Sequence, residues 1–138
     1  GWKLRYIAMN VRQELPLCRA LVSETGGEAA AAPEDTAALT RLFASARRTV
    51  SMRLHALTLS YLAGTPAFGI DGDGRIAAFA KECGIPYRTV EECGDIAAAL
   101  EEALTAETPD AAIWNERLAA GRAALARALR APEKEKEK

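Results

Sequence analysis

The sequence predicts an α/β fold, with a Rossmann-like parallel sheet that has helices on both of its faces. Short apolar runs of strand length alternate with longer segments of helical periodicity along the chain. Glycine, proline or acidic residues bound most of the longer segments, and these are the usual start and stop signals of helices. Strands that alternate with helices are typical of βαβ units, whose strands pair in parallel.

In the first half of the chain, residues 3–10 (KLRYIAMN) predict a buried strand because apolar side chains dominate the run. A helix follows over residues 11–27, with a proline near its first turn and two glycines at its end. Residues 28–32 (EAAAA) fit a short edge strand. The next helix, over residues 33–48, opens on acidic residues, and its large apolar residues recur at helical spacing.

The second half of the chain continues the alternation. Gly64 and Gly84 are placed to end two helices, and Asp95 is a natural N-cap for another. Residues 71–74 (DGDG) form a loop between a strand and a helix. The predicted strands here are residues 49–52, 65–70 and 85–90, and the predicted helices are residues 53–64, 75–84, 95–105 and 108–131.

The length of 138 residues is sufficient for one domain with one core. We assign residues 1–131 to a single Rossmann-like domain. The charged segment at residues 132–138 (PEKEKEK) is expected to be a disordered tail. Both ends of the chain indicate a domain taken from a longer protein.

Composition and charge argue against several function classes. The net charge of −1 provides no basic excess for a nucleic acid partner. The three cysteines form no CxxC pattern, and with a single histidine they predict a reduced, cytoplasmic protein without a metal site. No apolar run has the roughly 18 residues that a membrane span requires.

The stretch SMRLHALTLSYLAG carries the only histidine of the chain, His55, two residues after Arg53. Both lie where a predicted strand passes into a helix, and ligands of open α/β sheets bind at the carboxyl ends of the strands. A helix amino terminus attracts phosphate or carboxylate, and a guanidinium binds the same groups. In an extended segment, residues two apart point the same way, so both side chains could face one ligand. The alternative is a helix-start histidine bonded to nearby backbone, with Arg53 on the surface.

Residues 51–86 resemble the C-terminal half of polysaccharide pyruvyl transferases, whose pattern is GMRLHAL…A…G.P..GI.YDPKV..F...LGIP. MRLHAL matches at residues 52–57 without a gap, and the register continues through GTPAFGI to GIP at residues 84–86. YIAMNVRQE, at residues 6–14, resembles the family more weakly. The resemblance implies the C-terminal domain of a fold like that of the B-type glycosyltransferases.

The resemblance also implies a reaction. The family moves a pyruvyl group from phosphoenolpyruvate onto two hydroxyls of a sugar, as a cyclic ketal, in cell-surface polysaccharide biosynthesis. Arg53 and the backbone of Leu54 would bind phosphoenolpyruvate, and His55 would be the general acid. No organic cofactor is implied. The acceptor, a sugar or lipid-linked saccharide, would bind mainly to an N-terminal domain outside this chain. The chain alone is therefore expected to be inactive, and a lipid-linked acceptor would bring the intact enzyme to the inner membrane face.

Asp73 and Arg75 fall on the aspartate and lysine of the family pattern, which implies that they bind substrate as well. Gly72 and Gly74 replace the tyrosine and proline of that pattern, which makes the loop more flexible. The loop is no calcium site, because Arg75 and Ile76 stand where an oxygen ligand and a glycine are needed.

Two other functions are compatible with the same fold. A glycosyltransferase with a nucleotide-sugar donor would need an acidic residue for the ribose, and Glu91 or Glu92 could serve. A non-catalytic anion-binding module is the other alternative, and the altered DGDG loop is the feature that favours it.

Overall fold

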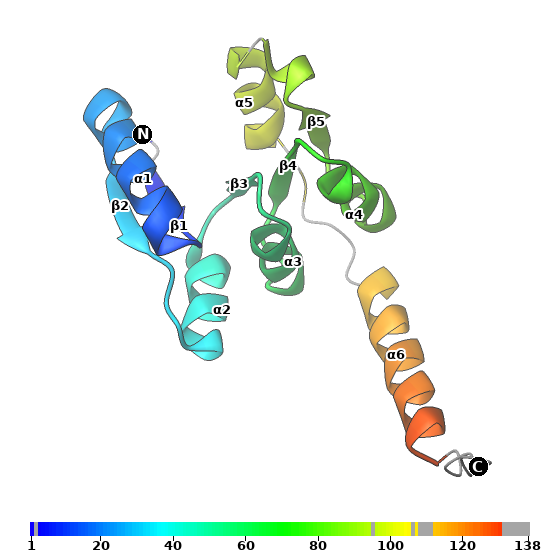
Figure 1. Ribbon diagram of the computed structural model, residues 1–138. Coiled ribbons are helices and arrows are strands. Elements are labelled where there is room, and N and C mark those ends of the chain that lie inside the picture. Colours follow the sequence, from blue (N-terminus) through cyan, green and yellow to red (C-terminus); the bar gives the residue numbers. More distant parts are fainter. Residues whose placement is uncertain (2, 95, 106, 108–111, 131–138) are drawn as a thin grey trace, which may run out of the picture.

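The computed structural model describes residues 1, 3–94, 96–105, 107 and 112–130. Strands and helices alternate along the chain and every strand pair is parallel, so the predicted α/β class is confirmed (Figure 1). Where the sequence predicted one sheet, the described residues form two small ones, β1–β2 and β3–β4–β5. The predicted cap at Asp95, the predicted helix start at residues 108–111 and the tail at residues 132–138 lie outside the described residues.

The first sheet is a parallel βαβ unit. Strand β1 (Arg5–Ala8) pairs in register with β2 (Glu28–Ala31), and helix α1 (Val11–Thr25) connects them. The Asn10 side chain caps α1 by accepting from the Gln13 N–H, which explains why the helix begins directly after the strand. The carboxyl end of β1 and the start of α1 therefore lie together.

The second sheet has β4 (Ala67–Asp71) at its centre, between β3 (Thr49–Ser51) and β5 (Tyr87–Thr89). Helix α3 (Leu54–Leu62) joins β3 to β4, and α4 (Arg75–Cys83) joins β4 to β5. Both helices pack against β4. Because all three strands run in parallel, their carboxyl ends meet at one edge of the sheet, where α3 and α4 begin.

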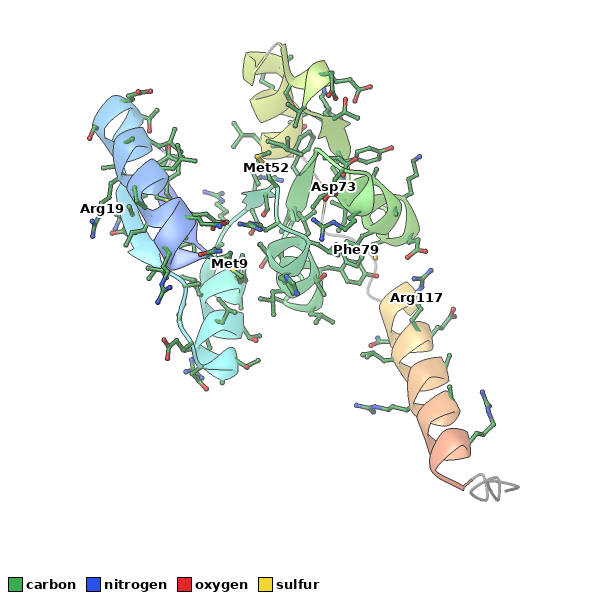
Figure 2. All side chains as sticks on the ribbon, viewed as in Figure 1. Met9, Arg19, Met52, Asp73, Phe79 and Arg117 are labelled. Carbon is green, nitrogen blue, oxygen red and sulfur yellow. The ribbon has the colours of Figure 1, made fainter. Side chains whose placement is uncertain are left out.

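The remaining helices lie outside the two sheets. Helix α2 (Thr36–Ser45) leads from the first sheet to the second and packs on α3. A 3₁₀ turn, η1 (Glu91–Gly94), follows β5 and precedes α5 (Ile96–Thr105). Helix α6 (Ala112–Arg130) extends away from both sheets (Figure 1). Arg117 of α6 donates to Glu82 of α4 over 2.5 Å (Figure 2).

The main core lies between α3, α4 and β4. Tyr61 of α3 and Phe79 of α4 meet edge to face with ring centroids 6.2 Å apart, and Tyr61 is almost fully buried. Phe68 of β4 is also buried, and its side chain points to the opposite face of that strand from those of Ala67 and Gly69. The buried cluster consists of Leu57, Tyr61, Ala67, Ile76, Ala80, Cys83 and Ile85.

Gly69 lies in the middle of β4 at the point where both helices approach the strand. A Cβ atom at this position would be 2.6 Å from Ile76 Cγ2, 3.2 Å from Leu57 Cδ1 and 3.3 Å from Tyr87 Cβ. We expect Gly69→Ala to lower the free energy of unfolding by about 1–3 kcal/mol, because overpacking forces these neighbours apart. Urea unfolding followed by circular dichroism measures the change.

Gly121 of α6 provides the matched control, because a Cβ atom built there meets no described atom within 4 Å. Gly121→Ala should raise the free energy of unfolding by about 0.5–1 kcal/mol, the usual difference between the two residues inside a helix. Equal effects of the two substitutions would contradict the steric account of Gly69.

Candidate functional site

The amino terminus of α3 places Arg53, Leu54 and His55 at the carboxyl end of β3. Arg53 is the N-cap residue, with an extended backbone (φ −108°, ψ 122°), and its side chain makes no capping bond. Ser51 holds the turn, because its Oγ accepts from the Arg53 N–H over 2.9 Å. The first N–H groups of a helix have no partner within the helix. The N–H groups of Leu54 and His55 are therefore available to an anion at this positive end of the helix.

The Arg53 guanidinium binds Glu14 of α1. Arg53 Nε donates to Glu14 Oε1 over 2.5 Å, and Arg53 Nη2 contacts the same oxygen. The other carboxylate oxygen of Glu14 accepts from the N–H groups of Met9 and Asn10, over 2.8 Å and 3.0 Å. One carboxylate thus ties the end of β1 to the start of α3, across the two sheets.

The hydrogen bonds of Glu14 stabilise its ionised form. Partial burial opposes ionisation, but the N–H groups of Asn10 and Met9 and the Arg53 guanidinium outweigh it. The pKa of the Glu14 carboxyl is therefore lower than its usual value. At neutral pH the pair consists of a carboxylate and a guanidinium.

A small open cavity lies between β1 and β3, the strands at which the two sheets face each other. Its volume is about 160 Å³. Met9, at the end of β1, lies on the side of that strand that faces the second sheet (Figure 2). Polar and apolar side chains mix in its wall, which includes three arginines, and two of these, Arg5 and Arg53, are paired with carboxylates outside the lining. The lining residues are Arg5, Ile7, Met9, Leu42, Phe43, Arg48, Thr49, Val50, Ser51, Arg53 and Ala56.

His55 is exposed at the second position of α3 and does not line the cavity. The prediction that Arg53 and His55 point the same way assumed an extended segment through both residues. Helix α3 begins at Leu54, so that alternation does not apply to this pair. The structure places the two residues at the same helix end, with Arg53 directed to Glu14 and His55 accessible to solvent.

Asp73 lies in the loop after β4, at the same edge of the second sheet (Figure 2), and Arg75 is the first residue of α4. They pair with each other, since Arg75 Nε donates to Asp73 Oδ2 over 2.8 Å. This hydrogen bond from Arg75 lowers the pKa of Asp73 and raises that of Arg75. Both side chains are largely exposed.

Asp71 is the residue that shapes this loop. Its buried carboxylate accepts from the Gly74 N–H through Oδ2 and from the Ile76 N–H through Oδ1, each over 3.0 Å. These bonds hold the start of α4. Gly74 has a φ of 87°, a conformation that suits glycine and not the proline of the family pattern. The DGDG loop is therefore a defined turn in which Asp71 is structural.

Glu92, one of the two acidic residues suggested for a nucleotide ribose, lies within η1, and its side chain reaches back to the end of β5. Its Oε2 accepts from the Thr89 N–H over 2.8 Å, and this backbone bond lowers the pKa of Glu92. Glu91 is exposed in the same turn. The carboxylate of Glu92 is thus already used by the backbone.

The family model of polysaccharide pyruvyl transferases matches residues 1–74, which is more than half of the 138-residue chain. The chain belongs to the polysaccharide pyruvyl transferase family. Comparisons with curated proteins and with solved structures gave no match.

The part of this pyruvyl transferase that matches runs from β1 to the loop after β4. It includes Glu14, Arg53, Leu54, His55 and Asp73 and ends one residue before Arg75. Both sides of the cavity, β1 and β3, thus lie within the matched part.

Sequence reasoning on this pyruvyl transferase missed Glu14. The available signal was an acidic residue four positions after Asn10, the last residue of the predicted strand, which directly precedes a predicted helix. Such a residue can reach back to the N–H groups at the helix start. Its contact with Arg53, 39 residues away, leaves no local signal in the sequence.

Among the described residues, no helix combines the length and apolar character that crossing a membrane requires.

Proposed function

We propose that this chain is the donor-binding domain of its pyruvyl transferase and that phosphoenolpyruvate is the donor. The proposal depends on one observation. At the amino terminus of α3, an arginine and available helix N–H groups lie beside a cavity. The Arg53 guanidinium and the Leu54 N–H would bind the phosphate and carboxylate of the donor. Asp73 in the neighbouring loop and Arg75 at the start of α4 would also bind substrate. A second domain would supply most of the site for the acceptor saccharide.

In the proposed reaction, His55 protonates the methylene carbon of phosphoenolpyruvate. The central carbon becomes electrophilic and accepts the oxygen of a sugar hydroxyl. The bond from this carbon to the phosphate oxygen breaks, phosphate leaves with its electron pair, and the second hydroxyl closes the ketal. The two hydroxyl protons balance the reaction, because one restores His55 and the other goes to phosphate. An imidazole suits this role because it can hold and release a proton near neutral pH.

The proposed domain role has consequences for the intact protein. This chain by itself would bind donor without turnover, because the acceptor site would be incomplete. The proposed chemistry needs no organic cofactor or metal. The enzyme would act in the cytoplasm, at the inner membrane face where the acceptor is lipid-linked, in the synthesis of cell-surface polysaccharide.

A titration of the intact protein separates the proposed donor from its rivals. Calorimetry with phosphoenolpyruvate, inorganic phosphate and a uridine-diphosphate sugar should show binding of phosphoenolpyruvate and much weaker binding of phosphate alone, since phosphate lacks the carboxylate. Binding of the nucleotide sugar without phosphoenolpyruvate would identify a glycosyltransferase instead. Binding of phosphoenolpyruvate without ketal formation, over a panel of saccharide acceptors, would favour a non-catalytic module.

A further inference from the structure

Glu14 divides its two carboxylate oxygens between two tasks. Oε2 accepts both backbone N–H groups at the start of α1, and Oε1 accepts from Arg53 Nε and contacts Nη2. The Glu14 side chain is 20% exposed, whereas that of Arg53 is 50% exposed. The less exposed, backbone-anchored carboxylate therefore fixes the more exposed guanidinium.

The contact with Glu14 also orients the guanidinium. Arginine has five N–H donors in a planar group, and a carboxylate that accepts along one edge of this group restricts its rotation. Among the described contacts, Arg53 uses Nε and Nη2 for Glu14, which leaves Nη1 for a ligand. Without the carboxylate, an arginine this exposed would sample several rotamers, and binding an anion would require ordering it.

We propose that Glu14 is a positioning residue for Arg53, holding its guanidinium at the carboxyl ends of β1 and β3 so that Nη1 faces the donor anion. The inference rests on the proposed function, because it assumes that Arg53 binds phosphoenolpyruvate. It adds a residue of α1, the helix that connects the strands of the first sheet, to a site whose other members lie at the edge of the second sheet. The donor site is then built across the two sheets, by one ion pair.

The test compares Glu14→Gln with Asp35→Asn in the intact protein. Glutamine can keep an oxygen toward the two backbone N–H groups while its NH₂ group replaces the oxygen that faces Arg53. Asp35 caps α2 by accepting from the Ala38 N–H over 2.7 Å, and it also pairs with an arginine, Arg41, at 3.9 Å. Asp35→Asn therefore makes the same charge-to-amide change at a helix start that is outside the site.

Glu14→Gln should raise the Kd and the KM for phosphoenolpyruvate roughly 10-fold, as expected for loss of a charge-assisted hydrogen bond that orders Arg53. The kcat should stay within about two-fold, because His55 is untouched. Asp35→Asn should leave all three constants unchanged. Glu14→Asp keeps the charge but has a shorter side chain, and it should also raise the Kd for phosphoenolpyruvate. This variant provides the test if the glutamine variant does not fold.

A double variant tests whether Glu14 acts through Arg53. In an Arg53→Ala background, Glu14→Gln should cause no further loss of affinity, whereas independent effects would multiply. Unchanged or tighter binding in both Glu14 variants, together with lost binding in Arg53→Ala, would overturn the positioning role and leave the proposed function standing. Normal donor binding by Arg53→Ala would overturn the proposed function, and the inference with it.

Discussion

Replacing His55 by alanine in the intact protein is expected to lower kcat for ketal formation by about 10²- to 10⁴-fold, the usual contribution of a general acid. Protonation of the methylene carbon activates the donor, and the chain has no other histidine. The KM for phosphoenolpyruvate should change only a few-fold, because Arg53 and the α3 N–H groups remain. Steady-state kinetics with varied phosphoenolpyruvate separates the two constants.

His55→Gln distinguishes proton transfer from hydrogen bonding. Glutamine is a hydrogen-bond donor but cannot transfer a proton at neutral pH, so this variant should be as slow as the alanine variant. The exposure of His55 predicts unchanged thermal stability for both substitutions, which excludes unfolding as the cause. Substantial activity in the glutamine variant would remove His55 from the role of general acid.

Local signals allowed most elements of the fold to be predicted. The predicted strand at residues 49–52 is β3, and the helix predicted after it ends at Leu62, directly before Ala63 and Gly64, with a φ of 68° at the glycine. The helix predicted from residue 33 begins at Thr36, because the Asp35 side chain caps it. Apolar periodicity and glycine positions contain this information, since both act within a few residues.

The division into two sheets could not be predicted in the same way. Pairing between strands depends on contacts that are distant in the sequence, and β3 is only three residues long. The loop after β4 shows the same limit at a smaller scale. The family pattern indicates Asp73, whereas Asp71 is the buried residue whose carboxylate accepts from the N–H groups of Gly74 and Ile76.

For the candidate site, the amino terminus of α3 could be predicted from the sequence, but the residues and the cavity beside it could not. Arg53 and His55 were found because they occupy a strand-to-helix junction within the family pattern. The partner of Arg53 comes from α1, and the cavity beside it lies between β1 and β3. These features require the two sheets to be placed against each other, which local pattern does not determine.

Arg53→Ala in the intact protein is expected to raise the Kd for phosphoenolpyruvate by about 100-fold, from the loss of two charge-assisted hydrogen bonds at roughly 1.5 kcal/mol each. The substitution also leaves the Glu14 carboxylate, held by Met9 and Asn10, without its guanidinium beside an anionic donor. Repulsion from this carboxylate adds to the loss. Calorimetry, or chemical shift changes at millimolar donor, measures the affinity.

Two further arginine variants serve as controls for the effect of Arg53→Ala on donor affinity. Arg53→Lys keeps the charge but not the planar fork, so its Kd should lie between those of the wild type and the alanine variant. Arg19 is exposed on the side of α1 that faces away from the second sheet, and Arg19→Ala should leave donor binding unchanged (Figure 2). Equal losses in the Arg19 and Arg53 variants would mean that the donor responds only to overall charge. A loss of donor affinity in the Arg53 variants alone would instead indicate a direct contact between Arg53 and the donor at the amino terminus of α3.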